Sequence, residues 1–199
     1  MRQLAEALAH RYTVYLVDLP GHGLSPPVMP FTLPSVLHAL RSVTPGEAHW
    51  IGWSLGGLLA LAMAIASPSR VISVSLMAAS PCFVERPDWP GQSRELLERM
   101  GQELRDHHEA TLRRFIGLQT FGHENARELS KRISAQIAEA PSARMTALQG
   151  GLSLLMHADL RVFVPRLSLP MLVVLGERDR LIPGSVGQKI QEPVSYTHL

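Results

Sequence analysis

The sequence predicts an α/β protein built on a mostly parallel β-sheet with helices on both faces. Four short apolar runs are continuous rather than alternating, as in strands that are buried on both faces of a parallel sheet. They cover residues 12–17, 49–53, 71–77 and 171–175. Helical patterns separate the first three runs. Strands that alternate with helices in this way are typical of an α/β fold.

Two helical patterns are specific enough to place helices between these strands. Four apolar residues recur at the spacing of one helix face: Leu33, Val36, Leu37 and Leu40. Residues 55–66 are rich in alanine and leucine, and Pro68 lies just beyond them. We therefore expect a buried helix that ends before this proline.

Residues 85–160 differ from the rest of the chain, because they carry most of its charged residues and no strand-like run. Two apolar stripes at helical spacing lie in this segment: Leu96, Leu97, Met100 and Leu104, then Leu112, Phe115 and Ile116. Since an ordinary crossover needs far fewer residues, we expect a helical cap over the strand ends, where such folds bind ligands. The predicted core is then 1–84 with 161–192, and 193–199 form a tail of doubtful origin.

Composition narrows the class of protein. The 199 residues carry a net charge of +2 and are 46% hydrophobic, which fits one soluble globular domain. Basic runs with interleaved aromatics, as in nucleic-acid-binding proteins, are absent from the sequence. The single cysteine, Cys82, fits a reducing compartment, and the apolar stretch 55–66 is too short to span a bilayer. We expect a cytoplasmic monomer with no nucleic-acid or membrane partner.

The segment Gly52-Trp53-Ser54-Leu55-Gly56 matches the pattern G-x-S-x-G. It follows a predicted strand and opens a predicted helix, which is the setting of a nucleophile elbow. We expect small residues at 52 and 56, helped by Gly57, to let strand and helix approach closely. The backbone N–H of Leu55, at the helix start, would stabilise a developing oxyanion. The alternative is a glycine-rich turn with an incidental serine.

A serine nucleophile needs a histidine base that is oriented by a carboxylate, and in elbow enzymes the chain order is serine, acid, histidine. Asp179 lies just past the last predicted strand and is the expected acid. Glu177, which is nearer the strand end, is the alternative acid, and a charged surface turn is the alternative to both. His198 is the histidine that follows Asp179. We do not expect it to be the base, because chain termini are usually frayed.

Neither a metal site nor a cofactor site is expected. His107 and His108 are adjacent, so on a helix they face different directions, and no ligand set at metal-binding spacing joins them. Gly21-His22-Gly23 lacks the third glycine of a dinucleotide loop and is expected to be a tight turn.

Together these segments resemble the pimeloyl-[acyl-carrier protein] methyl ester esterases of biotin synthesis, a family with the α/β-hydrolase fold. The segments that carry the resemblance are 17–25, 52–57, 79–83 and 114–120. The resemblance implies a carboxylic-ester hydrolase that cleaves the methyl ester of pimeloyl-acyl carrier protein through a serine acyl-enzyme. A broad short-chain carboxylesterase or thioesterase is the alternative enzyme, and a non-catalytic binding protein of the same fold is the alternative outside enzymes.

Site residues are implied by the same resemblance. Ser54 is the nucleophile, Asp179 the orienting acid and Leu55 the oxyanion donor. The residues implied to contact the substrate are Trp53, Ser54, Leu55, Phe115, Ile116, Gly117, Leu118 and Gln119. The residues implied to hold the acidic carrier protein are Arg114, Arg127 and Lys131, while Ala110 replaces a further basic residue of the family. An equal alternative is a solvated helix face, in which Glu109, Glu124 and Glu128 pair with the cations Arg113, Arg114, Arg127, Lys131 and Arg132.

Two features of the family fall outside this chain. A His-Gly loop that supplies the second oxyanion donor precedes the family's first helix, at which this sequence starts. The family's base histidine follows a further helix and strand after the acid. We therefore expect these 199 residues to lack the base, and to be inactive and poorly folded as they stand.

Overall fold

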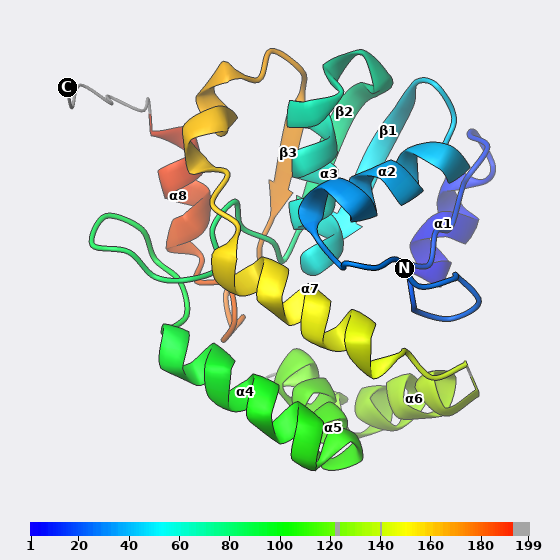
Figure 1. Ribbon diagram of the computed structural model, residues 1–199, viewed down its shortest axis with the longest axis vertical. Helices are drawn as coiled ribbons and strands as arrows, with labels where there is room; N and C mark the ends of the chain where they lie inside the picture. The colour runs from blue at the N-terminus through cyan, green and yellow to red at the C-terminus, as the bar shows by residue number, and fades with distance from the viewer. Residues whose placement is uncertain (122–123, 140, 193–199) are drawn as a thin grey trace.

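The computed structural model of this chain describes residues 1–121, 124–139 and 141–192. Three parallel strands form its sheet in the order β1-β2-β3 (Figure 1). They are β1 Ala48–Trp53, β2 Val71–Met77 and β3 Met171–Val174. Three of the four predicted strands are thus confirmed, each within one residue of its expected ends.

Two helices cover one face of this sheet, α3 directly and α2 on top of it (Figure 1). Helix α2, Leu33–Val43, begins with a capping box between Thr32 and Ser35 and buries Val36, Leu37 and Leu40. Helix α3, Leu55–Ala66, is buried continuously from Gly57 to Ala64, as expected for a helix that is apolar on all sides. Both helices agree with the predicted positions, and η1, Pro68–Arg70, follows α3.

The opposite face of the sheet is exposed, which corrects the expected burial on both faces. Burial alternates along β3, where Leu172 is 57% and Val174 44% exposed. Ile51 and Trp53 of β1 are exposed in the same alternating pattern. Helix α3 covers the other face, and among the described helices it packs most extensively on the sheet. A continuous apolar run in the sequence therefore does not show whether a strand is buried on one face of the sheet or on both.

Residues 12–17 do not form the predicted strand. After the short helix α1, Arg2–Leu8, this segment has no regular secondary structure, and Leu16 is 64% exposed. The Tyr12 ring contacts the His49 ring edge-on at 6.1 Å, so the segment passes the start of β1 without pairing with it. A strand requires a neighbour that exchanges backbone hydrogen bonds, and in the described part of the chain β1 pairs with β2 alone.

Four helices lie at the end of the sheet toward which the strands point (Figure 1). They are α4 Arg94–Asp106, α5 His108–Thr120, α6 Ala126–Glu139 and α7 Met145–His157. Helix α7 contacts α3 of the core, α4 packs against α7, and α5 lies between α4 and α6. This is where the predicted cap was expected, although its boundaries at 85 and 160 stay a prediction. The tail 193–199 lies outside the described residues.

The two chain segments that lead into and out of these helices are joined side by side. Cys82 and Asp159 form an antiparallel bridge, and Leu160 N–H donates to Pro81 C=O at 2.9 Å. Arg161 follows at the start of η2, Arg161–Arg166, which leads to β3. The two ends of the helical block are thus joined to each other where they meet the core.

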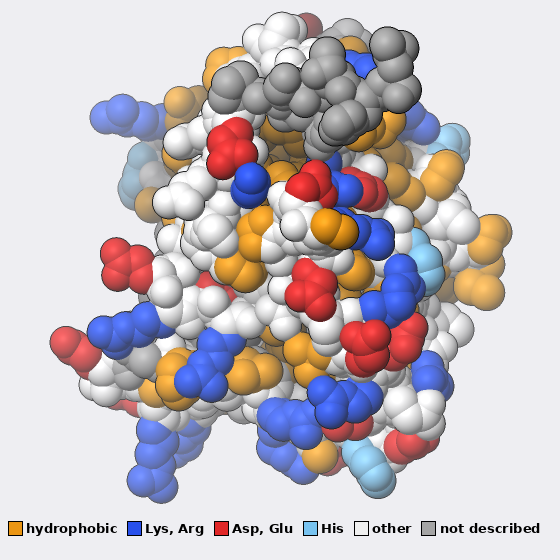
Figure 2. Space-filling view, turned by 90° about the vertical axis from the view of Figure 1, so that its left-hand side faces the viewer, with side chains coloured by type: hydrophobic (Ala, Val, Ile, Leu, Met, Phe, Trp, Pro, Cys, Tyr) orange, Lys and Arg blue, Asp and Glu red, His pale blue; other side chains and the backbone are white. Residues whose placement is uncertain are grey.

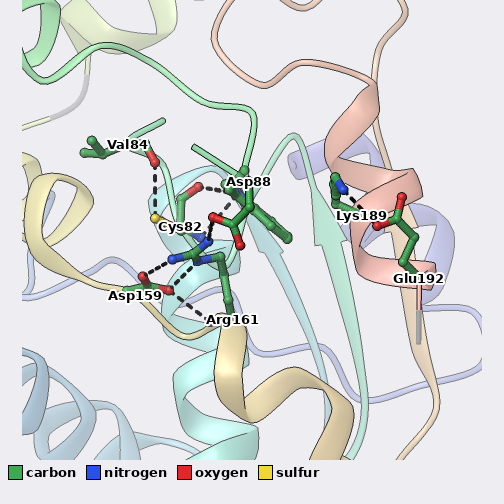
Figure 3. A network of polar contacts seen from close by, with 9 residues as sticks. Cys82, Val84, Asp88, Asp159, Arg161, Lys189 and Glu192 are labelled. Atoms are coloured by element: carbon green, nitrogen blue, oxygen red, sulfur yellow. Dashed lines mark hydrogen bonds and ion pairs between the residues drawn. The ribbon is translucent and has the colours of Figure 1, made fainter. Parts of the chain in front are cut away.

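Arg161 ties this junction together (Figure 3). Its guanidinium donates to the Asp159 carboxylate at 2.8–2.9 Å and to Asp88 at 3.0 Å, and it lies 5.6 Å from the centre of the Trp89 ring. Hydrogen bonds from Arg161 lower the pKa of Asp159. Burial raises the pKa of the Cys82 thiol, which donates to the Val84 carbonyl at 3.2 Å. Cys82 is therefore a buried packing residue.

After β3 the chain passes through a loop to α8, Ser185–Gln191, where Val186 is fully buried. Within the described ranges, no helix is long and apolar enough to cross a membrane.

Candidate active site

Ser54 occupies a sharp turn between β1 and α3. Its φ of 52° and ψ of −119° are unusual for a residue with a side chain, and such strain is typical of functional sites. The Ser54 N–H donates to the Met77 carbonyl of β2 at 2.9 Å, and its own carbonyl accepts from Gly57 N–H at 2.9 Å. The structure thus has the strand–turn–helix geometry that the motif predicts.

Two glycines permit this turn. A Cβ added at Gly52 would overlap the Gly56 carbonyl and lie 2.5 Å from the Gly57 nitrogen. A Cβ on Gly57 would overlap the side chain of Ala79. At Gly56, by contrast, an added Cβ meets nothing within 4 Å. The prediction that a small residue is required is therefore confirmed at positions 52 and 57. It was wrong at position 56, because residue 56 points away from β1.

The N–H of Leu55 lies at the first position of α3, where backbone donors have no partner inside the helix. No backbone or side-chain acceptor among the described residues receives it. It is therefore available to a negatively charged oxygen beside Ser54, and the helix dipole favours such a charge. The side chain of Leu55 packs under α7, since a Cβ on Gly151 would lie 2.8 Å from Leu55 Cδ2. Trp53 lies next to Ser54 and is 42% exposed.

The three strand ends are level with one another. Trp53 pairs with Met77, and Met77 pairs with Val174. Since neighbouring strands lie about 4.8 Å apart, the backbones of Ser54 and Leu175 emerge about 10 Å from each other along one edge of the sheet. The loop that follows Leu175 thus starts close enough to carry a carboxylate toward the serine.

Asp179 is the fixed carboxylate of that loop. Its Oδ1 accepts hydrogen bonds from Leu181 N–H at 2.8 Å and Ile182 N–H at 3.0 Å. Glu177 is exposed and makes no hydrogen bond to any residue that the structure describes. A carboxylate held by two backbone donors is pre-organised, which favours Asp179 over Glu177 as the acid.

No histidine within residues 1–121, 124–139 and 141–192 makes a hydrogen bond to Ser54 or Asp179. His22, His49 and His157 have other partners. His198 lies outside the described residues. His107 lies between α4 and α5, and His108 begins α5. No group of three or more potential metal ligands occurs in the described part of the chain.

The segment implied to line the acyl site lies on α5. Ile116 is 5% exposed, Phe115 and Leu118 are half-buried, and Gly117 is exposed. The side chain of Gln119 lies outside the described residues. The end of α5 contacts the acid loop, because the Arg180 guanidinium lies 3.7 Å from the centre of the Phe121 ring. The structure therefore brings this end of the segment to the loop of Asp179.

The cations implied to bind the carrier protein lie on α5 and α6. Arg114 forms an ion pair with Glu103, whereas Arg127 and Lys131 are exposed and, four residues apart, share one face of α6. Figure 2 shows basic and acidic side chains together at the lower end of the molecule. Of the expected acidic partners, Glu109 pairs with Arg113 at 3.5 Å, whereas Glu103, which pairs with Arg114, was not among those expected.

Comparison with known proteins agrees with this geometry. Residues 1–193 match the family model of the alpha/beta hydrolase fold. The pimeloyl-[acyl-carrier protein] methyl ester esterase of Methylococcus capsulatus is 39% identical over 183 residues, which is 92% of this chain and 72% of that protein. The enzyme of that name from Aeromonas hydrophila is 40% identical over 182 residues, covering 90% and 72%. The chain belongs to the pimeloyl-[acyl-carrier protein] methyl ester esterase family.

Solved structures support the α/β-hydrolase fold of this esterase. A hydrolase from Oleispira antarctica matches with a TM-score of 0.79 at 19% identity, covering 98% of this chain and 74% of that one. The enol-lactonase of Burkholderia xenovorans matches with a TM-score of 0.78 at 20% identity, covering 96% and 72%. At these identities the likeness concerns the fold alone.

The glycine geometry of the esterase gives a testable contrast. We expect Gly52→Ala to lower the free energy of unfolding by about 1–3 kcal/mol, because overpacking forces β1 and α3 apart. Gly56→Ala should be neutral or raise it by up to about 1 kcal/mol, because alanine favours the helix and meets open space. Urea unfolding followed by circular dichroism measures both. Equal losses in the two variants would contradict the assigned roles.

Proposed function

We propose that this esterase hydrolyses the methyl ester of pimeloyl-acyl carrier protein, with Ser54 as nucleophile. The observation that carries the proposal is the strained backbone of Ser54 at the start of α3, in a chain whose relatives bear the name of that activity. A protein that only bound ligands would have no need of a hydroxyl held in such a turn. We also propose a cytoplasmic location and a monomeric state.

The proposed reaction uses Ser54, the Leu55 N–H, Asp179 and a histidine base. Ser54 Oγ attacks the ester carbonyl while a histidine base takes its proton, and the negative oxygen forms beside the Leu55 N–H. The tetrahedral intermediate collapses as the protonated histidine gives its proton to the departing methoxide, which leaves as methanol. Water then attacks the acyl-enzyme by the same route and frees the carboxylate. Asp179 orients the histidine, and no metal or cofactor takes part.

The carrier protein is the proposed macromolecular partner. Arg127 and Lys131 present two exposed charges on α6, and Arg114 lies on the neighbouring α5. A carboxylate of an acidic carrier protein would displace Glu103 as the ion-pair partner of Arg114. Such exposed contacts steer association and weaken with salt. The segment from Phe115 to Gln119 would then receive the acyl chain that the docked carrier presents.

We expect Ser54→Ala to abolish the protein-dependent hydrolysis of p-nitrophenyl acetate, by several orders of magnitude if the base is in place. The assay supplies imidazole in solution, so that the test of Ser54 does not depend on which histidine serves as base. The melting temperature of both proteins is the folding control. Equal imidazole-stimulated rates would remove Ser54 from the mechanism. A full rate without imidazole that is lost in His198→Ala would identify His198 as the base, against expectation.

Charge reversal of Arg114, Arg127 and Lys131 to Glu should weaken binding of methyl pimeloyl-acyl carrier protein about tenfold, since each exposed contact contributes about 0.2–1 kcal/mol. Titration calorimetry with Ser54→Ala protein measures binding without turnover. The matched control reverses three exposed cations outside helices α4 to α7, Arg2, Arg11 and Arg166, and has the same net charge. Equal weakening in both triple variants would reject a specific docking surface.

A further inference from the structure

The loop of Asp179 is hydrogen-bonded to a glutamine from the segment that leads into the cap helices. Gln92 Nε2 donates hydrogen bonds to the carbonyl of Arg180 at 2.8 Å and to that of Leu181 at 2.9 Å. Both N–H donors of the side-chain amide are thus used on consecutive carbonyls. The contact joins residues almost ninety positions apart in the chain, so it is a tertiary contact of the folded enzyme.

The same two peptide groups are held from their other side by Asp179. The Arg180 carbonyl and the Leu181 N–H belong to one planar peptide group, and the Leu181 carbonyl and the Ile182 N–H belong to the next. Gln92 binds both carbonyls, while Asp179 Oδ1 accepts from both N–H groups. Because each peptide is rigid, a rotation that breaks the bond on one side also displaces the bond on the other.

Gln92 is itself well fixed. Its N–H donates to the Phe83 carbonyl at 2.8 Å, and its carbonyl accepts from Glu85 N–H at 2.9 Å. Its neighbour Gly91 has no room for a side chain, because an added Cβ would lie 2.6 Å from the Phe83 carbonyl oxygen. The amide of Gln92 therefore extends from a backbone that is bound on both sides, as a positioning group should.

A second contact holds the same loop from the cap helices. The side chain of Arg180 lies over the ring of Phe121, at the end of α5. The loop is thus bound through its backbone by Gln92 and through a side chain by Phe121. At its core end it is anchored by Ile182, which is 2% exposed.

We propose that Gln92 is a positioning residue for ester hydrolysis, which holds the two peptides after Asp179 so that this carboxylate faces the histidine base. The inference rests on the proposed role of Asp179 as the acid. Without the two donors of Gln92, the peptides can rotate, Oδ1 loses its fixed partners, and the carboxylate orients the base less well. Substrate binding does not depend on this orientation, so the effect falls on kcat rather than on KM.

The test uses the whole chain with Gln92→Glu and Gln92→Leu. Glutamate has the same shape as glutamine, but its carboxylate would repel the two carbonyl oxygens. Leucine is of similar size and has no hydrogen-bond donor. Gln102→Leu is the matched control, since the Gln102 amide binds Asp106 within α4. We expect amide hydrogen exchange at Leu181 and Ile182 to accelerate about tenfold in both Gln92 variants, as for loss of one or two modest hydrogen bonds. The control and the amides of α3 should not change.

In the Ser54-dependent ester assay run without imidazole, so that the base is one that Asp179 can orient, kcat of both Gln92 variants should fall about tenfold with KM within about twofold, the signature of lost transition-state stabilisation. Asp179→Asn, which keeps the accepting oxygen and removes the charge, tests the acid separately. Full activity of Asp179→Asn would overturn the role of Asp179 as the acid. Hydrogen exchange at Leu181 and Ile182 would then still show whether Gln92 holds this loop. The role of Gln92 would be overturned if hydrogen exchange at Leu181 and Ile182 were unchanged in the Gln92 variants. It would also be overturned if the Gln92 variants kept full kcat while Asp179→Asn lost it.

Discussion

The close approach of β1 and α3 is the constraint on which the site depends. At Gly52 and Gly57 there is no room for a side chain, so the helix begins directly after the strand. The connecting residue must then adopt a positive φ, and that residue is Ser54. The strain is offset by the buried apolar surface of α3, which anchors the turn from behind. One packing requirement therefore sets both the exposure of the hydroxyl and the direction of the Leu55 N–H.

The other parts of the site are arranged around this turn by the parallel sheet. Because the ends of β1, β2 and β3 are level, the turn of Ser54 and the loop of Asp179 emerge at one edge. The segments that flank the cap helices are tied to each other through Arg161, and Gln92 extends from one of them to the acid loop. The position of the cap and the geometry of the acid are thus physically linked in this esterase.

Local patterns predicted much of this fold and site. The apolar runs located three strands, and the G-x-S-x-G motif located the turn, because both depend on residues near one another in the sequence. Segment 12–17 was wrongly predicted to be a strand, since a strand is defined by its neighbour and not by its own residues. Gly56 was wrongly taken as sterically required, because the motif does not say which glycine faces β1. Gln92 escaped notice because its partners lie on a distant loop, and a lone glutamine carries no pattern.

The most direct test of the central claim is covalent labelling of the folded chain with a fluorophosphonate, which reacts with activated serines. Intact mass and peptide mapping locate the adduct. If the elbow geometry activates Ser54, one adduct forms on Ser54 in the folded protein, and Gly52→Ala and urea-unfolded chains are labelled far more slowly. Labelling that falls on another serine, or that proceeds equally in the unfolded chain, would contradict the claim that this turn creates the nucleophile.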